Sequence, residues 1–119
     1  MNKLFYLILI CFYLVSCDDI FVEDISNKKT TIIAPADNAS LTNSEITLAW
    51  ETIEGAESYQ VIVVSSSFDS IEKFACDSVT TNYKLKLPLD AGTYEWSVQA
   101  HNSAYSSLKS YGKFKVTAP

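Results

Sequence analysis

From residue 30 onward, apolar and polar residues alternate in short runs that are separated by turn-forming residues. The clearest run is 93–102, in which Tyr94, Trp96, Val98 and Ala100 share one face and polar residues alternate with them. Successive side chains of a β-strand point to opposite faces, so this run predicts a strand with one face in a core. Similar runs lie at 30–34, 45–50, 58–65, 74–79, 82–87 and 113–116. About seven strands at this spacing are typical of an all-β, antiparallel, Ig-like sandwich.

Two of these runs carry additional information about the core. Trp50 is in phase with the apolar residues of 45–50, and Trp96 is in phase with those of 93–102, so both tryptophans are predicted to be core residues. The run 58–65 is apolar on both faces, because Ile62 and Val64 alternate with Tyr59, Val61 and Val63. It therefore predicts either a central strand covered on both sides or an exposed apolar patch.

The N-terminal residues have a different pattern. Residues 4–15 are an unbroken apolar run that follows Lys3 and precedes Ser16 and Cys17. A membrane-spanning helix needs about 20 apolar residues, so this run is too short to span. A positive start, a short apolar stretch and a small residue are typical of a cleaved secretory signal.

The segment Leu14-Val15-Ser16-Cys17 resembles the lipobox of bacterial lipoproteins. The resemblance implies that Cys17 is acylated and becomes the new N-terminus, and two or three acyl chains hold a protein stably on a membrane. Asp18 and Asp19 follow Cys17 directly. They resemble two signals: an inner-membrane retention signal of enteric bacteria and a surface-export signal of Bacteroidetes-type bacteria. The Arg-free composition favours the surface-export signal. A solvated acidic tether is the simpler alternative. The expected division is a signal at 1–16, an acidic tether at 17–29 and a domain at 30–119.

Size and composition narrow the function classes. With 119 residues there is room for one domain. The chain has nine lysines and no arginine, against 14 Asp and Glu residues. The resulting net charge of −5 argues against a nucleic-acid partner. Of the three cysteines, Cys11 leaves with the signal and Cys17 carries lipid, so Cys76 stands alone and is expected to act as a small apolar core residue. If Cys17 were not acylated, a Cys17–Cys76 bridge would become available.

Residues 30–117 resemble a fibronectin type III domain. In that family a tryptophan ends the second strand, a tyrosine begins the third, and a later strand has the sequence pattern Y-x-V-x-V-x-A-x-N. In this chain Trp50 and Tyr59 match the first two features. The segment from Tyr94 to Asn102 matches the third, with Trp96 in place of an aliphatic residue. The resemblance implies that the Tyr94 hydroxyl binds a backbone group upstream. The 101–111 segment lacks Arg-Gly-Asp, so integrin-type adhesion is not supported. Behind a lipobox, the domain resembles the sandwich modules of Bacteroidetes surface lipoproteins.

The sequence contains few residues in the arrangements that catalysis requires. His101 is the single histidine, and the three glycines form no G-x-S-x-G or phosphate-binding motif. After processing, His101 and Cys76 are the remaining soft metal donors, fewer than a zinc site needs. The carboxylates fall in turns or on outward strand positions, where a small sandwich has no deep cleft to raise a pKa. We therefore expect no enzyme, no cofactor and no metal.

Binding is the favoured activity. Tyr105 and Tyr111 flank a serine-rich segment, and Phe68 lies in another. Exposed aromatic rings with nearby hydroxyls on a rigid scaffold are typical of recognition loops, although such rings also pack back on a sandwich edge. The sequence predicts a lipid-anchored outer-membrane or surface module whose loops contact a glycan or a protein. The alternatives are a structural spacer that uses the Ile62 and Val64 face and, more remotely, a small hydrolase or inhibitor.

The anchor assignment can be tested directly. Replacing Cys17 with Ala removes the acylated thiol, so we expect the protein to lose incorporated palmitate and to leave the membrane fraction. Labelling of growing cells with a palmitate analogue, followed by fractionation, measures both effects. Cys76→Ala is the matched control and retains the label. Label that persists in the Cys17→Ala protein would contradict lipidation at this residue.

Overall fold

The fold is that of a computed structural model, which describes residues 22–117. It contains eight strands, β1 (Ile32–Ala34), β2 (Ala39–Leu41), β3 (Glu45–Trp50), β4 (Ser58–Ser66), β5 (Ile71–Thr80), β6 (Lys84–Pro88), β7 (Gly92–His101) and β8 (Ser110–Val116). Within residues 22–117 no helix has the length and apolarity needed to cross a membrane. The predicted signal, 1–16, lies outside the described residues.

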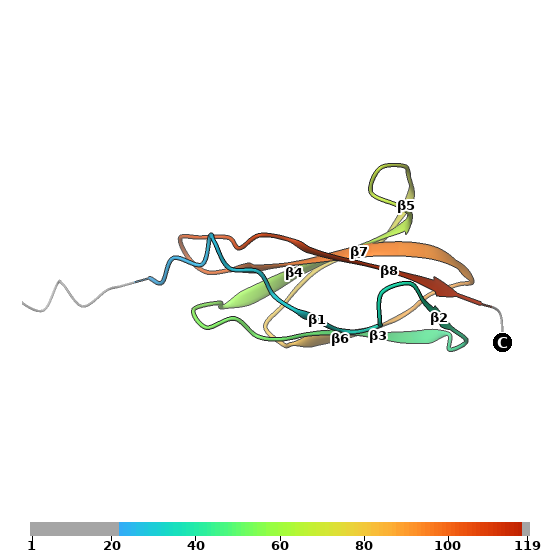
Figure 1. The fold of residues 1–119 in the computed structure, drawn as a ribbon, viewed down its shortest axis with the longest axis horizontal. Coiled ribbons are helices and arrows are strands. Elements are labelled where there is room, and N and C mark those ends of the chain that lie inside the picture. The colour runs from blue at the N-terminus through green and yellow to red at the C-terminus, as the bar shows by residue number, and fades with distance from the viewer. Residues whose placement is uncertain (1–21, 118–119) are drawn as a thin grey trace, which may run out of the picture.

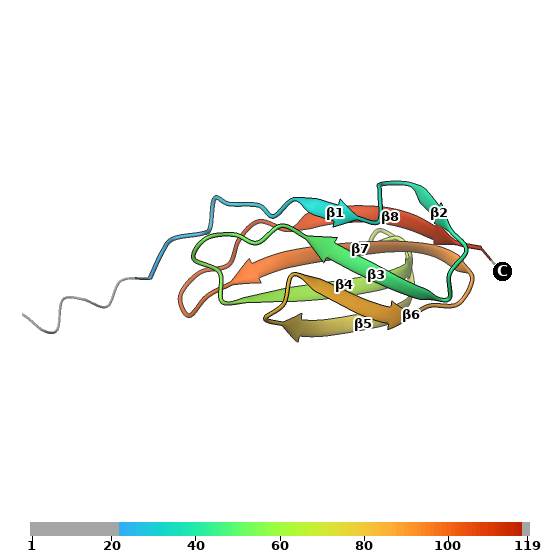
Figure 2. The same ribbon diagram turned by 90° about the horizontal axis from the view of Figure 1, so that it is seen from below.

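The strands form two sheets that face each other. One sheet has three strands in the order β1-β3-β6, and the other has five in the order β2-β8-β7-β4-β5 (Figure 2). Figure 1 shows the two layers edge-on, with β7 and β8 in one and β3 and β6 in the other. The predicted all-β sandwich is therefore confirmed. The face of the five-stranded sheet turned away from the three-stranded sheet is called the outer face below.

The number of strands differs from the prediction because the first strand is split. β1 pairs antiparallel with β3, and after Pro35 the chain crosses to the other sheet, where β2 pairs parallel with β8. The sequence pattern predicts no strand between the runs 30–34 and 45–50. A three-residue strand without apolar alternation leaves no pattern to detect, and it forms because β8 offers a free edge. The sandwich thus has eight strands and one parallel pair.

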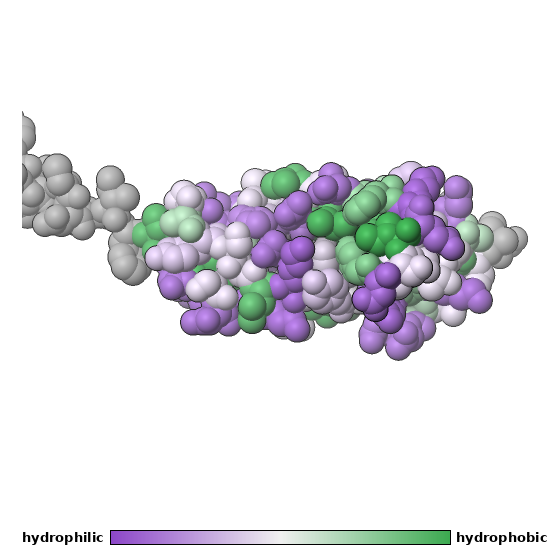
Figure 3. All heavy atoms as spheres, turned by 90° about the horizontal axis from the view of Figure 1, so that it is seen from above, coloured by the Kyte–Doolittle hydropathy of each residue, from purple (hydrophilic) through white to green (hydrophobic). Residues whose placement is uncertain are grey.

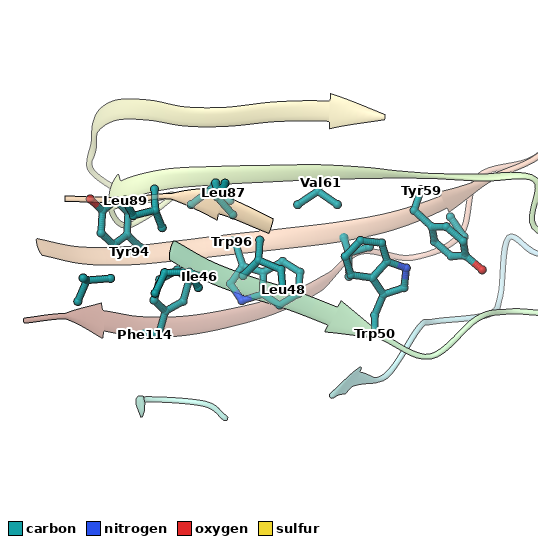
Figure 4. Packing of buried hydrophobic residues seen from close by; sticks show 14 of the residues in the cluster. Ile46, Leu48, Trp50, Tyr59, Val61, Leu87, Leu89, Tyr94, Trp96 and Phe114 are labelled. Atoms are coloured by element: carbon teal, nitrogen blue, oxygen red, sulfur yellow. The ribbon is translucent and has the colours of Figure 1, made fainter. Parts of the chain in front are cut away.

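Aromatic rings fill the space between the sheets (Figure 4). Trp50 lies 5.7 Å from Tyr59 and 6.2 Å from Trp96 between ring centroids, and both tryptophans are buried. Tyr94 stacks on Phe114 at 5.6 Å. Ring pairs at these separations are favourable beyond the area that they bury. The prediction that the two tryptophans are core residues is confirmed.

The Trp96 indole lies directly on β8. Gly112 faces Trp96 in the β7–β8 register, and a Cβ atom added to Gly112 would lie 2.8 Å from the Trp96 Nε1 atom and 3.3 Å from the Ile32 Cδ1 atom. No side chain larger than hydrogen fits there without displacing a buried ring. The close approach of β8 to the tryptophan therefore depends on glycine at this position.

Tyr94 ties the β6–β7 connection to the core. Its hydroxyl donates a 2.7 Å hydrogen bond to the Asp90 carbonyl oxygen, which confirms the backbone contact that the family resemblance implies. Burial, and to a lesser degree the Asp90 carboxylate, raise the pKa of Tyr94 above its ordinary value. The hydroxyl therefore remains a donor throughout the neutral range.

Tyr83 lies differently from the expectation. The alternation of the run 82–87 predicts that Tyr83 shares a core-facing side with Leu85 and Leu87, but β6 begins only at Lys84 and the Tyr83 side chain is 53% exposed. Lys84 lies 5.7 Å from the centre of the Tyr83 ring, so the ring faces a cation instead of the core. Cys76 is half-buried with a free thiol and packs against the core, as expected of a small apolar residue.

The segment before β1 belongs to the folded domain. Ile25 is fully buried in the core, and the Leu108 amide donates a 2.9 Å hydrogen bond to the Lys28 carbonyl. The Asn102 side-chain amide donates to the carbonyl oxygens of Glu23, at 2.8 Å, and Gly55, at 3.1 Å. These non-local contacts extend the folded domain back to about Glu23, whereas the sequence pattern predicts a start at residue 30.

The contact between Trp96 and Gly112 predicts a specific stability defect. Gly112→Ala forces a methyl group onto a buried indole, and we expect the free energy of unfolding to fall by about 1–3 kcal/mol. Urea denaturation monitored by tryptophan fluorescence measures this change. Gly92→Ala is the matched control, because its added Cβ atom meets Tyr94 at an ordinary 3.7 Å. Equal stabilities of the two variants would contradict the close approach.

Candidate functional site

The β4–β5 hairpin bends over the outer face of the five-stranded sheet. Its tip, residues 66–71, rises above β7 in Figure 1. Ser66 has φ 77°, a conformation that few residues other than glycine adopt, and it lies where the hairpin leaves the plane of the sheet. The register of β5 against β4 also shifts twice near the tip, between Val63 and Val64 and again between Ser65 and Ser66. Such irregularities increase local bending and twist.

Phe68 attaches this tip to the sheet. Its ring meets the Tyr111 ring edge-on, with 5.5 Å between centroids and an interplanar angle of 80°. Its backbone N–H donates a 2.8 Å hydrogen bond to the Glu95 carboxylate. Tyr111 lies on β8 and Glu95 on β7, so one hairpin residue contacts both strands. Two of the three predicted ligand-binding residues, Phe68 and Tyr111, are therefore neighbours.

The same arrangement resolves the two-sided apolarity of β4. Val64 is opposite Glu95, and Ile62 is opposite Ser97, so all four residues point to the outer face. Val64 and Ser97 are nevertheless buried, while Ile62 is half-buried. β4 is therefore the central strand of the first alternative, covered fully at Val64 and partly at Ile62.

Beyond this covered region, large apolar side chains remain exposed. Tyr111 is 54% exposed, Phe74 61% and Ile71 41%. We refer to Phe68, Ile71, Phe74 and Tyr111 as the outer aromatic patch. Figure 3 looks onto this face and shows hydrophobic side chains gathered between hydrophilic ones. A group of this kind on an exposed sheet face is typical of an interaction surface.

Charged residues border the outer aromatic patch. The lysines Lys113 and Lys115 follow Tyr111 on β8 at alternate exposed positions. The carboxylates Asp69 and Glu72 lie exposed on the hairpin side. An apolar centre with a polar border of both signs is the usual composition of a protein–protein contact.

Tyr105, the third predicted ligand-binding residue, lies elsewhere. It is in the β7–β8 turn, where its backbone N–H donates a 2.7 Å hydrogen bond to the Asn102 side-chain oxygen. This turn is at the end of the sandwich that contacts Glu23, whereas Tyr111 is six residues further along the chain, within β8. The three aromatic residues therefore do not form one site.

The residues considered for chemistry occupy structural positions. The His101 Nδ1 atom lies 2.7 Å from the Ser106 hydroxyl, a contact that spans the β7–β8 turn. Among residues 22–117 no cluster of three or more His, Cys, Asp or Glu side chains could hold a metal ion. The absence of catalysis stays a prediction. Cys17, Asp18 and Asp19 lie outside the described residues, so lipidation and export also stay predictions.

Comparison with known proteins identifies the fold. No protein-family model matches the chain, and no curated protein matches it in sequence. A fibronectin(III)-like module of Clostridium thermocellum CbhA is 15% identical, with a TM-score of 0.54, over 75% of this chain and 96% of that module. The fn3 domain of the human collagen alpha-1(XX) chain is 16% identical, with a TM-score of 0.58, over 86% and 94%.

A third similar structure is a segment of a larger protein. It is the chitinase ChiW of Paenibacillus sp., a cell-surface-expressed multi-modular enzyme. The matched segment is 17% identical, with a TM-score of 0.53. The match covers 85% of this chain but only 9% of the chitinase. These likenesses show that the chain has a fibronectin type III-like fold, as its sequence pattern predicts. At such identities they concern the fold alone, because this sandwich carries many unrelated functions.

The attachment of the hairpin tip gives a stability prediction. Phe68→Ala removes the ring that covers part of the outer face, and we expect the free energy of unfolding to fall by about 1–2 kcal/mol. Tyr105→Ala, which removes an aromatic ring from the exposed β7–β8 turn, should change it by less than about 0.5 kcal/mol. Urea denaturation compares the two variants. A Phe68→Ala protein as stable as the wild type would show that the ring contact does not hold the tip.

Proposed function

We propose that this protein is a lipid-anchored module of the cell envelope that binds a protein partner through the outer aromatic patch. Acylated Cys17 is the anchor, and Asp18 and Asp19 act as the export signal. The fibronectin type III-like fold supplies the rigid scaffold. The observation that carries the proposal is the exposure of Phe74 and Tyr111 beside a hairpin that is itself bent onto the sheet.

The patch favours a protein over a glycan. Hot spots of protein interfaces are enriched in aromatic residues and lie within a rim of polar groups. In the patch, Phe74 and Ile71 provide purely apolar surface, and the rings of Phe68 and Tyr111 meet edge to face instead of forming one flat platform. The patch therefore offers no single flat aromatic face on which a sugar ring could stack. The partner surface is expected to be apolar at its centre.

A structural spacer is the second candidate. In Figure 1 the chain enters at one end of the long axis and leaves at the other, the arrangement that in-line modules use to separate their neighbours. CbhA contains fibronectin(III)-like modules, and the chitinase is a multi-modular enzyme. A spacer depends on the length and rigidity of the sandwich, whereas a binding module depends on the identity of its patch residues.

Site-specific cross-linking separates these two functions. A photo-reactive amino acid placed at Phe74 in the full chain, irradiated in the native membrane, is expected to give one discrete adduct with another protein. The control position is Tyr83, which is similarly exposed at 53% but lies before β6, outside the patch. Changing Tyr111 to Ser in the same protein should reduce the adduct by about tenfold or more, the loss of one hot-spot residue.

Adducts of equal yield at Phe74 and Tyr83 would contradict a specific patch. So would an adduct at Phe74 that persists unchanged in the Tyr111→Ser protein. A spacer is supported if cross-linking at the patch fails while an unrelated sandwich of equal length replaces the domain without loss of function in the cell.

A further inference from the structure

A groove opens between the two sheets at the end of the sandwich where β8 ends. Its larger part is a cavity of about 370 Å³, whose lining comes from both sheets and consists of Ser44, Ser65, Lys73, Ala75, Pro88, Leu89, Asp90 and Tyr94. A second hollow of about 180 Å³ shares Ser44, Leu89 and Asp90 with it and continues towards Ala91 and Thr117. We call the two together the distal groove. Its larger part is within the size range of small-molecule sites, about 300–1,000 Å³.

The floor of the distal groove is held by hydrogen bonds. The Leu89 amide donates to the Ser44 carbonyl at 2.9 Å, which joins the β6–β7 and β2–β3 connections. The Tyr94 hydroxyl donates to the Asp90 carbonyl at 2.7 Å. Leu89 and Tyr94 lie side by side at one end of the core in Figure 4, and both are more than nine-tenths buried. The groove is therefore formed before any ligand arrives, which reduces the entropic cost of binding.

The polar groups of the groove are of mixed type. Ser44, Ser65 and Tyr94 contribute hydroxyls, Lys73 an ammonium group and Asp90 a carboxylate. Among residues 22–117, neither Lys73 nor Asp90 takes part in an ion pair. Their charges are thus available to a ligand, one as a donor and the other as an acceptor. Because the two charges are opposite, the groove offers no net attraction to an ion.

Apolar groups lie among these polar ones. Pro88, Leu89 and Ala75 present aliphatic surface in the same cavity. A sugar ring has C–H faces that pack on aliphatic surface and a rim of hydroxyls that both donate and accept hydrogen bonds. A peptide, in contrast, would require a row of backbone partners along a strand edge. The mixture of aliphatic surface with groups that donate and accept hydrogen bonds matches a sugar more closely.

We propose that the distal groove binds a neutral oligosaccharide of two or three rings. One ring occupies the larger cavity, between Lys73 and Asp90, and the next extends over Asp90 towards Ala91. The net charge of −5 on the chain disfavours acidic glycans, since it repels them at long range. The groove is separate from the outer aromatic patch, so this inference does not rest on the proposed protein contact.

Titration of the protein by nuclear magnetic resonance tests the proposal. The ¹⁵N-labelled full chain in detergent micelles is titrated separately with maltotriose, cellotriose, mannotriose and xylotriose. At least one of these is expected to give saturable shifts of the Leu89, Ala91 and Gly92 amides. A trigalacturonic acid of the same length should bind more weakly than that sugar.

Substitutions then assign the binding to the groove. Asp90→Ala removes the carboxylate but keeps the backbone carbonyl that Tyr94 uses, and we expect an affinity at least about tenfold lower. Lys73→Ala provides a second, independent variant with the same expectation. Asp77→Ala is the matched control, because Asp77 is an exposed carboxylate of β5 outside the groove. The amide spectra of all variants confirm that they are folded.

Several results would overturn the proposal. These are the absence of saturable shifts with all four neutral sugars, shifts confined to residues outside the groove, tighter binding of trigalacturonic acid, and unchanged affinity in folded Asp90→Ala and Lys73→Ala proteins. None of these results bears on the cross-linking of the outer aromatic patch.

Discussion

The two sheets are organised around the burial of Trp50 and Trp96, and the rest of the sandwich depends on it. Both indole nitrogens are buried without a hydrogen-bond partner in the described part of the chain. Each such N–H costs about 1–3 kcal/mol. Burial of an aromatic ring removes about 150–250 Å² from water and contributes roughly 4–6 kcal/mol, so packing outweighs the lost hydrogen bond. The close approach of β8 to Trp96 follows from this balance and makes Gly112 necessary.

Local alternation accounts for what the sequence predicted correctly. In β7 the inward residues from Tyr94 to Ala100 are all apolar, and the structure buries Tyr94, Trp96, Val98 and Ala100 as that pattern requires. Features that depend on distant partners left no such signal. β2 exists because β8 has a free edge, and the segment with Ile25 is ordered because the core accepts its side chain. The alternation of apolar and polar residues identifies each strand separately, whereas these contacts join segments that lie far apart in the chain.

The same limit applies to the sites. Tyr105 and Tyr111 are close in sequence, but the chain runs from a turn onto a strand between them, which separates their side chains along the sandwich. Phe68 and Tyr111 are distant in sequence, and the bend of the β4–β5 hairpin brings them together. The distal groove draws Ser44, Lys73 and Asp90 from three different connections or strands, so no short motif could identify it. Residue type predicted which side chains could bind, and topology determined which of them act together.

The parallel pairing of β2 with β8 has a mechanical consequence. Ala39, Ser40 and Leu41 are opposite Phe114, Lys115 and Val116, and the two strands run in the same direction. The chain enters and leaves the sandwich at opposite ends, so a pull on those ends slides β2 along β8. Such a load acts on the hydrogen bonds of the ladder together, in shear, instead of opening them one after another. A load along the long axis of the sandwich is therefore carried by all three residue pairs at once.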